Sequence, residues 1–346
     1  MNRTKPSQRS VVVEAPARLH MGFLDFGRLG GRRFGGVGLT IDGLSTRIRA
    51  ERASSNSAGA GYPRILPLLE ILQRKFDLHT MDTNGGCVRI EVEKSIPEHV
   101  GLGSGTQMAL AVGCAVARLF DLETSASTVA ALLDRGRRSG IGIGAFDQGG
   151  FLVDGGSAII GDSGVPPIVS RLAFPAHWRV LLVFDDSAQG LHGGEESGAF
   201  CALPMFPEAS SAQLCRLVLL RALPALQAAN IEEFGAAITE LQQAIGDYFA
   251  QAQGGRYASP RVAEALAWFA GRGASGIGQS SWGPTGFVIV ESEDRAQVLL
   301  EAARAWWNGN GGNGRTALRF AVYQGRNRGG EIWVREARAQ NAANYA

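Results

Sequence analysis

Lysine is scarce in this chain of 346 residues, which contains only Lys5, Lys75 and Lys94. None of them ends a G-x-x-x-x-G-K sequence, so the chain lacks the Walker loop of many nucleotide-binding proteins. An excess of one charge is missing as well, because the formal net charge is +2. Nucleic-acid-binding domains usually carry a strong basic excess, so we expect no nucleic-acid partner.

Cysteines and long apolar segments are also few. No pair of cysteines has the C-x-x-C spacing of zinc or redox sites, which indicates reduced and mostly buried thiols at Cys87, Cys114, Cys201 and Cys215. No apolar run reaches the roughly 18 residues that a membrane span needs. The polar N-terminus shows no signal peptide. We therefore expect a cytoplasmic protein without a membrane partner.

The chain does contain a glycine-rich loop, residues 97–107, between an expected strand and a small-residue apolar helix. Glycines permit positive φ and close approach of a ligand, and a helix N-terminus favours an anion. We therefore predict a phosphate or diphosphate site made by Gly101, Leu102, Gly103, Ser104, Gly105 and Thr106. The hydroxyls of Ser104 and Thr106 are also candidate Mg²⁺ ligands. The alternative is a glycine-rich turn that caps a core helix.

Apolar periodicity predicts a mixture of strands and helices, and hence an α+β architecture. We expect strands at residues 10–14, 35–41, 45–51, 88–93, 180–184, 287–291, 316–323 and 331–334. We expect helices at residues 65–76, 128–138, 211–250, 260–269 and 295–307, besides the one after the glycine loop. Glycine and proline cluster between residues 161 and 175, which predicts one domain over residues 1–168 and a second over 169–346.

Three segments resemble motifs of the GHMP kinase superfamily, which includes galactokinase and the homoserine and mevalonate kinases. They are Pro-Ala-Arg at residues 16–18, the loop at 97–105 and the glycine-rich segment at 276–286. The resemblance implies a two-domain fold, with an N-terminal ribosomal-S5-like domain and a C-terminal ferredoxin-like domain. It places the site between the two domains, and it implies a homodimer.

Within the superfamily, longer segments resemble the β-ribofuranosylaminobenzene 5′-phosphate synthase family. These segments are residues 15–41, 139–156 and 191–196. The resemblance implies phosphoribosyl transfer from 5-phosphoribosyl 1-diphosphate to 4-aminobenzoate or 4-hydroxybenzoate, with loss of CO2 and pyrophosphate. The product, β-ribofuranosylaminobenzene 5′-phosphate, would serve tetrahydromethanopterin biosynthesis. We expect Mg²⁺ to take part and no redox cofactor.

The glycine loop departs from the kinase pattern at one point. Kinases of the superfamily usually continue the loop with a second serine, whereas here Ser104 is followed by Gly105, Thr106 and Gln107. We therefore interpret the loop as a cradle for the diphosphate of the ribose substrate. The alternative is an ATP-dependent small-molecule kinase, because Thr106 could replace the second serine.

The candidate catalytic residues are Arg18, His20, Asp25 and Asp147. Arginine grips phosphate and carboxylate well, so we predict that Arg18 clamps one of these groups, the alternative being a surface ion pair. His20 is predicted to donate to a phosphate or to the substrate, the alternative being a structural histidine. Asp25 is predicted to bind Mg²⁺ or only to cap a turn. Asp147 is predicted to bind metal or to orient the substrate.

Two further groups complete the predicted site. We expect the phosphate to be enclosed by Arg28 and Arg33, although a solvated basic loop explains them equally well. The predicted substrate-binding residues lie in loops, where function concentrates, and are Gln148, His192, Glu195, Glu196, Ser281 and Gly283. We expect the neighbouring Trp282 to pack in the core.

Overall fold

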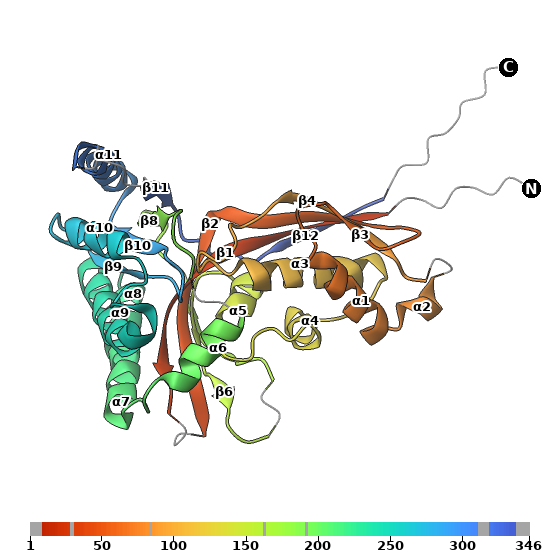
Figure 1. The fold of residues 1–346 in the computed structure, drawn as a ribbon, viewed down its shortest axis with the longest axis horizontal. Helices are drawn as coiled ribbons and strands as arrows, with labels where there is room; N and C mark the ends of the chain where they lie inside the picture. Colours follow the sequence, from red (N-terminus) through yellow and green to blue (C-terminus); the bar gives the residue numbers. More distant parts are fainter. Residues whose placement is uncertain are drawn as a thin grey trace, which may run out of the picture.

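A computed structural model describes residues 9–27, 31–82, 85–161, 164–190, 193–310 and 318–336 (Figure 1). The predicted α+β class is confirmed, with two sheets and helices against both. The first sheet contains β1 (Ser10–Asp25), β2 (Arg32–Arg52), β3 (Ser57–Ala58), β4 (Val88–Lys94), β5 (Phe151–Asp154), β6 (Ser157–Ala158), β7 (Ile168–Leu172) and β12 (Glu331–Arg335). Its main path runs β12-β1-β2-β4-β3. The sheet therefore takes strands from both sides of residue 168.

Strands β1 and β2 are longer than the sequence pattern predicts. Residues 15–25, which include several polar side chains, continue β1. Strand β2 joins the two strands expected at 35–41 and 45–51. The two strands pair antiparallel from Ser10 to Asp25, with register shifts between Pro16 and Arg18 and between His20 and Gly22. Such irregularities bend a strand without ending it, so β1 extends from the first core into the contact with the second half of the chain.

Helices cover one face of the first sheet (Figure 1). They are α1 (Ile65–Lys75), α2 (Leu78–Met81), α3 (Ser104–Leu119), α4 (Ala126–Leu132) and α5 (Ile141–Asp147). The helix expected at 65–76 is thus confirmed as α1. Small residues let α3 pack closely, since Ala109, Ala111 and Ala115 are fully buried in the same core as Val11 and Val13 of β1. This packing fixes the position of the glycine loop that precedes α3.

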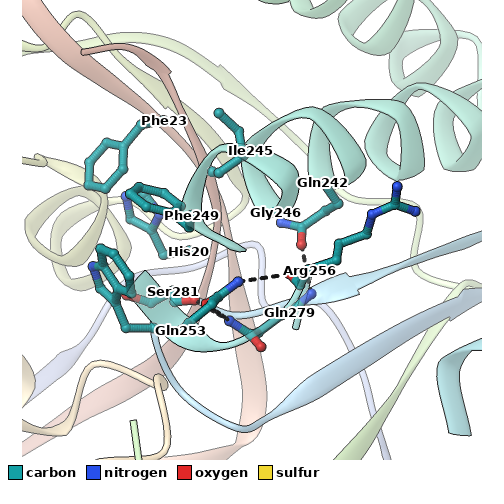
Figure 2. A pocket seen from close by; sticks show the side chains of 12 residues that line it. His20, Phe23, Gln242, Ile245, Gly246, Phe249, Gln253, Arg256, Gln279 and Ser281 are labelled. Carbon is teal, nitrogen blue, oxygen red and sulfur yellow. Dashed lines mark hydrogen bonds between the residues drawn. The ribbon is translucent and has the colours of Figure 1, made fainter. Parts of the chain in front are cut away.

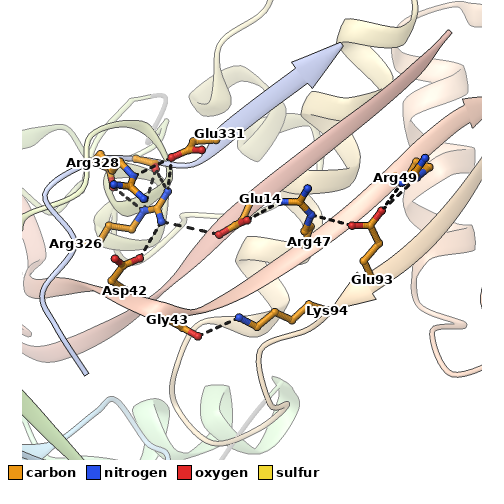
Figure 3. Close-up of polar contacts among 11 residues, drawn as sticks. Glu14, Asp42, Gly43, Arg47, Arg49, Glu93, Lys94, Arg326, Arg328 and Glu331 are labelled. Atoms are coloured by element: carbon orange, nitrogen blue, oxygen red, sulfur yellow. Dashed lines mark hydrogen bonds and ion pairs between the residues drawn. The ribbon is translucent and has the colours of Figure 1, made fainter. Parts of the chain in front are cut away.

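Ion pairs tie the last strand to the other face of this sheet (Figure 3). Arg326 precedes β12 and is 4% exposed. Its guanidinium lies 3.0 Å from Asp42 Oδ1, 3.1 Å from Glu331 Oε1 and 4.0 Å from Glu14 Oε1. Glu14 also accepts from Arg47 at 2.9 Å. A buried arginine with several carboxylate partners holds the C-terminal strand in place.

The second sheet has the order β11-β8-β10-β9 and lies between two groups of helices (Figure 1). Its strands are β8 (Arg179–Asp185), β9 (Gly276–Gln279), β10 (Gly286–Val290) and β11 (Leu318–Tyr323). The helices are α6 (Gly193–Ala202), α7 (Glu208–Leu217), the π-helical turn η1 (Val218–Ala222), α8 (Leu223–Gln227), α9 (Ile231–Gln253), α10 (Pro260–Ala270) and α11 (Glu293–Asn310). Alternate residues of β8 enter the two cores, Leu182 toward α9 and Leu181 toward α10 and α11.

The core between the two halves is rich in aromatic rings. Met21 and Phe23 of β1 enter the core that also contains Phe234 and Phe249 of α9. Trp282 is buried there, with its ring centroid 4.3 Å from that of Phe249, as the sequence predicted. The two halves therefore share a continuous apolar interior. Among the described residues, no helix is long and apolar enough to cross a membrane.

Candidate functional site

The glycine loop has the backbone geometry that its sequence predicts. Gly101 and Gly103 have φ of +86° and +85°, a region that L side chains rarely adopt. Helix α3 begins at Ser104, so the N–H groups of its first turn have no partners within the helix. Leu102 between the two glycines is buried, and it anchors the loop in the core.

Arg18 forms hydrogen bonds to two carbonyl groups of this loop. Its Nη1 donates to the carbonyl oxygen of Gly101 at 2.6 Å, and its backbone N–H donates to the carbonyl oxygen of Leu102 at 3.2 Å. A Cβ at Gly103 would lie 3.2 Å from the guanidinium carbon. The structure therefore brings Arg18 to the loop. Its side chain holds the carbonyl group of Gly101, and its backbone N–H holds that of Leu102.

The glycine loop also contacts the segment between β9 and β10, so the N-terminal and C-terminal parts of the chain meet here as well as in the aromatic core. A Cβ added to Gly101 would lie 2.2 Å from the carbonyl oxygen of Ser280, and one added to Gly283 would lie 2.3 Å from the carbonyl carbon of Val100. The hydroxyl of Ser280 donates to the carbonyl oxygen of Gly101 at 2.8 Å. Glycine at both positions lets the two backbones meet without intervening side chains.

A large cavity of about 680 Å³ opens beside the loop. The predicted residues that line it are Gly101, Gly103, Ser104, Gly105, Thr106, Ser281 and Gly283. Ser104, Gly105 and Thr106 are accessible there, because none of them is buried. The cavity thus joins the start of α3 to the segment that follows β9, as expected for a site between the two halves.

Sequence reasoning missed three basic residues that line this cavity. Arg64 comes just before α1, His99 precedes the glycine loop, and Arg135 follows α4. Arg64 Nη2 lies 3.0 Å from His99 Nε2, and its Nη1 lies 3.3 Å from Glu98. The Pro-Arg pair before α1 and the Glu-His pair before the loop were the available signals. Neither shows that distant segments meet at one cavity.

His20 lines a second, smaller cavity of about 30 Å³ (Figure 2). The centroid of its ring lies 4.5 Å from that of Phe23. Ser281 and Trp282 line both this cavity and the large one. The imidazole is 5% exposed. Burial, and then the nearby charge of Arg18, lower the pKa of His20 from 6.5 to about 3. His20 is therefore neutral at physiological pH.

The wall beside His20 is built from glutamine amides. Gln242 donates to the carbonyl oxygen of Met21, and its Oε1 accepts the backbone N–H of Gln279 at 2.7 Å. Gln279 in turn donates to the carbonyl oxygen of Ser281 at 2.9 Å (Figure 2). Ser281 has a φ of +56°. These bonds, with the bond of 2.9 Å from the Ser281 N–H to the carbonyl oxygen of His20, hold it in this unusual conformation.

Besides Arg18, His20 and Leu102, four described residues of the predicted site do not line the large cavity, and these are Asp25, Arg33, Asp147 and Gln148. Asp25 is seven residues along β1 from Arg18, roughly 23 Å at the rise of a strand; its carboxylate accepts from Ser211 at 2.7 Å and from the N–H of Gly27 at 2.6 Å. Arg33 is exposed, with its guanidinium 4.9 Å from the ring centre of Phe34.

Asp147 and Gln148 also lie outside the large cavity. Both line a separate depression beside the segment 165–168. Helix α5 is the reason: Gly142 near its start approaches Thr106, but the helix then carries Asp147 away by about 1.5 Å per residue. Burial raises the pKa of Asp147.

Four predicted residues remain, in the segments around residues 28 and 192–196. Arg28 and His192 lie outside the described residues. Glu195 and Glu196 lie in α6, where the backbone but not their side chains is described. A helix thus replaces the exposed loop that was the alternative for this segment.

The residues of the cavity suit a metal ion that arrives with a phosphorylated ligand. Among the described residues, no three His, Cys, Asp or Glu side chains gather into a metal site. The oxygen ligands that Mg²⁺ prefers are represented in the lining by the hydroxyls of Ser104 and Thr106 and by the carboxylate of Glu98. Mg²⁺ commonly binds proteins in this way, with phosphate oxygens and water completing its shell.

Comparison with known proteins adds independent findings. Models of the N-terminal and C-terminal domains of GHMP kinases match residues 65–155 and 222–309. β-Ribofuranosylphenol 5′-phosphate synthase from Archaeoglobus fulgidus is 33% identical to this chain over 332 residues, which cover 93% of this chain and 99% of that protein. The protein of the same name from Methanothermobacter thermautotrophicus is 27% identical, with coverage of 92% and 97%.

Solved structures show the same fold at low sequence identity. Homoserine kinase from Cytophaga hutchinsonii matches with a TM-score of 0.59 and 15% identity, over 96% of this chain and 100% of that one. Mevalonate diphosphate decarboxylase from Staphylococcus aureus matches with a TM-score of 0.64 and 14% identity, over 94% and 98%. These likenesses confirm the predicted GHMP kinase fold, with its N-terminal and C-terminal domains.

Proposed function

This chain belongs to the family of β-ribofuranosylphenol 5′-phosphate synthases within the GHMP kinase superfamily, and from that premise we propose its reaction. The enzyme transfers the phosphoribosyl group of 5-phosphoribosyl 1-diphosphate to a para-substituted benzoate. The bond between ribose C1 and the diphosphate breaks, and pyrophosphate leaves with the bonding electrons. The ring carbon that bears the carboxylate bonds to C1, and CO2 then leaves, its bonding electrons restoring aromaticity.

The observation that carries this proposal is the large cavity at the start of α3. A diphosphate placed there meets the N–H groups of Ser104, Gly105 and Thr106 and the positive end of a helix of 16 residues. Charge grows on the diphosphate as its bond to C1 breaks, so these oriented donors stabilise the transition state more than the ground state. Mg²⁺, when bound, would neutralise the leaving group beside Ser104, Thr106 and Glu98.

The rest of the cavity suits the other parts of the two substrates. Arg64 and Arg135 of its lining are suited to the 5′-phosphate of the ribose. Ser281 and Trp282 lie on the side toward His20, where the small cavity begins, and we assign this side to the benzoate. No enzyme nucleophile takes part, so the protein acts by holding the two substrates together and by stabilising charge.

The product named for the relatives bears on which benzoate is the substrate. The curated relatives are named for a ribofuranosylphenol product, which favours 4-hydroxybenzoate, whereas 4-aminobenzoate would give the ribofuranosylaminobenzene. We propose that one of these compounds is the substrate, and that the product is a precursor in tetrahydromethanopterin biosynthesis. Competition between the two at equal concentration would measure the preference as a ratio of kcat/KM.

One assay tests the reaction. The enzyme is supplied with Mg²⁺, 5-phosphoribosyl 1-diphosphate and each benzoate labelled at its carboxyl carbon, and labelled CO2 and pyrophosphate are measured. We expect both in equal amounts, and neither when the ribose substrate is omitted. The result that would overturn the proposal is ADP formation from ATP with an alcohol substrate, together with no labelled CO2 from either benzoate.

A further inference from the structure

A chain of hydrogen bonds begins at His20 and leads through the half-buried Ser139 to the buried Asp154. Nε2 of His20 lies 3.2 Å from the hydroxyl oxygen of Ser139. That hydroxyl donates to Oδ2 of Asp154 at 2.7 Å. Asp154 is 1% exposed, and it lies in β5, far from His20 in the sequence. The sequence predicts a catalytic role for His20 but singles out neither Ser139 nor Asp154.

The surroundings of Asp154 fit an ionised carboxylate. Its Oδ2 also accepts the backbone N–H of Gly140 at 2.9 Å, and its Oδ1 accepts the N–H of Gly156 at 2.8 Å. These partners and the Ser139 hydroxyl are all donors, as an ionised carboxylate requires. Burial raises the pKa of Asp154, and these hydrogen bonds oppose the shift.

The backbone leaves room for this arrangement at one position of β2. A Cβ added to Gly36 would lie 2.5 Å from Asp154 Oδ2 and 2.8 Å from the Ser139 hydroxyl oxygen. Any other residue at position 36 would therefore push the carboxylate and the hydroxyl apart. The three-residue chain is thus built into the packing of β1, β2 and β5.

Proton counting along the chain assigns the tautomer of His20. Ser139 has one hydroxyl hydrogen, and it is donated to Asp154. The oxygen of Ser139 accepts the backbone N–H of Ile141 at 3.2 Å. Since its one hydrogen is already donated, this oxygen can only act as an acceptor toward His20 as well, so Nε2 carries the hydrogen. The other ring nitrogen, Nδ1, is left with a lone pair. Among the described residues it has no hydrogen-bond partner and is not one of the fully buried polar atoms, and His20 is one of the residues that line the small cavity.

We propose that Ser139 and Asp154 are positioning residues, which orient His20 so that Nδ1 accepts a hydrogen bond from the para amino or hydroxyl group of the aromatic substrate. This inference rests on the proposed function. The small cavity, about 30 Å³, has room for a group the size of a water molecule and not for a ring. An amino or hydroxyl substituent fits it, while the ring itself lies on the side of Ser281 and Trp282.

This contact would strengthen as the reaction proceeds. When the ring carbon bonds to ribose C1, the para substituent donates electrons into the ring and its hydrogen becomes more acidic. A neutral acceptor at that hydrogen therefore stabilises the transition state more than the bound substrate. A protonated His20 would instead repel the developing positive charge, so a histidine that stays neutral suits this position.

The tautomer can be observed directly by nitrogen NMR of the full chain labelled in its histidines, with His20→Gln used to assign the signals. A ring nitrogen that carries hydrogen is readily distinguished from one that does not. We expect wild-type His20 to have hydrogen on Nε2 alone, and Ser139→Ala to show a mixture of both tautomers. Hydrogen on Nδ1 in the wild type, or an unchanged spectrum in Ser139→Ala, would overturn the inference.

Ligand binding tests the contact with the substrate. We expect wild type to bind 4-hydroxybenzoate about tenfold more tightly than 4-fluorobenzoate, whose substituent is of similar size but has no hydrogen to donate. Ser139→Ala should lose most of this preference and about 10- to 100-fold in kcat, with little change in the KM for the ribose substrate. Ser139→Thr keeps a hydroxyl and should retain the preference, and Ser170→Ala in β7 is the matched control.

The outcomes separate this inference from the proposed function. Wild type that releases no CO2 from any benzoate rejects the proposed function, while the tautomer and the binding preference still test the role of Ser139. A Ser139→Ala enzyme that keeps the preference for 4-hydroxybenzoate rejects the inference alone. Asp154→Asn provides a second test, since it should shift the His20 tautomer in the same direction as Ser139→Ala.

Discussion

His20 should make the protein lose stability in mild acid. Folding buries the imidazole, and burial together with the charge of Arg18 lowers its pKa from 6.5 to about 3. In the unfolded chain the pKa returns to 6.5, so below that pH the unfolded state binds a proton that the folded state does not. The free energy of unfolding therefore has its full His20 contribution above pH 6.5 and loses it as the pH falls toward 3.

The size of the effect follows from the shift. One pKa unit corresponds to about 1.4 kcal/mol, so the two units between the unfolded pKa and an assay pH of about 4.5 correspond to about 2.7 kcal/mol. Urea unfolding of wild type and of His20→Gln, whose amide does not titrate, should be measured at about pH 7.5 and about pH 4.5. Wild type should lose about 2.7 kcal/mol more than the variant over this interval.

A matched control is available, and the prediction can fail clearly. His177 is exposed, so His177→Gln is the matched substitution outside the buried site. The carboxyl groups are common to all three proteins, and their contributions cancel in the comparison. If wild type and His20→Gln lose the same free energy, His20 is not held neutral by burial, and the reasoning from its environment is refuted.

Three further predictions concern the glycine loop, the contact of Gly283 with that loop, and Arg326 before strand β12. Ser104→Ala with Thr106→Ala should weaken binding of 5-phosphoribosyl 1-diphosphate about tenfold in calorimetry and spare the benzoate; equal losses would contradict the assigned role. Gly283→Ala adds a Cβ 2.3 Å from the backbone of the glycine loop and should lower the free energy of unfolding by about 1–3 kcal/mol. Arg326→Met should lower it by about 3 kcal/mol in urea unfolding, whereas the exposed Arg328→Met should change it by less than about 1 kcal/mol.

Local patterns in the sequence predicted much of the fold. The helix expected at 65–76 and the strands expected at 88–93 and 180–184 are present as α1, β4 and β8. Their period of 3.6 or 2, or their unbroken apolar run, reflects burial on one face or on two. The pattern was wrong for β1, because it predicts a strand that ends at residue 14, before several polar residues. Pairing with β2 along the whole length of β1 carries the strand through them.

The site was predictable only where its parts are contiguous. The glycine loop and the start of α3 are one segment, so their sequence indicates an anion site directly. Arg64, His99 and Arg135 reach the same cavity from three separate segments, and no single-sequence pattern reports that convergence. Conversely, Asp25 and Asp147 belong to segments that do approach the loop, but the rise of a strand and of a helix carries each residue away from it.

The sequence by itself determined the family, the α+β class and the glycine loop that precedes α3, because each depends on residues that are neighbours along the chain. Only the tertiary structure decided that Arg18 fixes the loop carbonyls, and that Ser139 and Asp154 stand behind His20. The charge state and the tautomer of a histidine depend on burial and on hydrogen-bond partners from distant segments. In this chain those partners lie in other elements of the fold, so the chemistry of His20 is a property of the packed molecule.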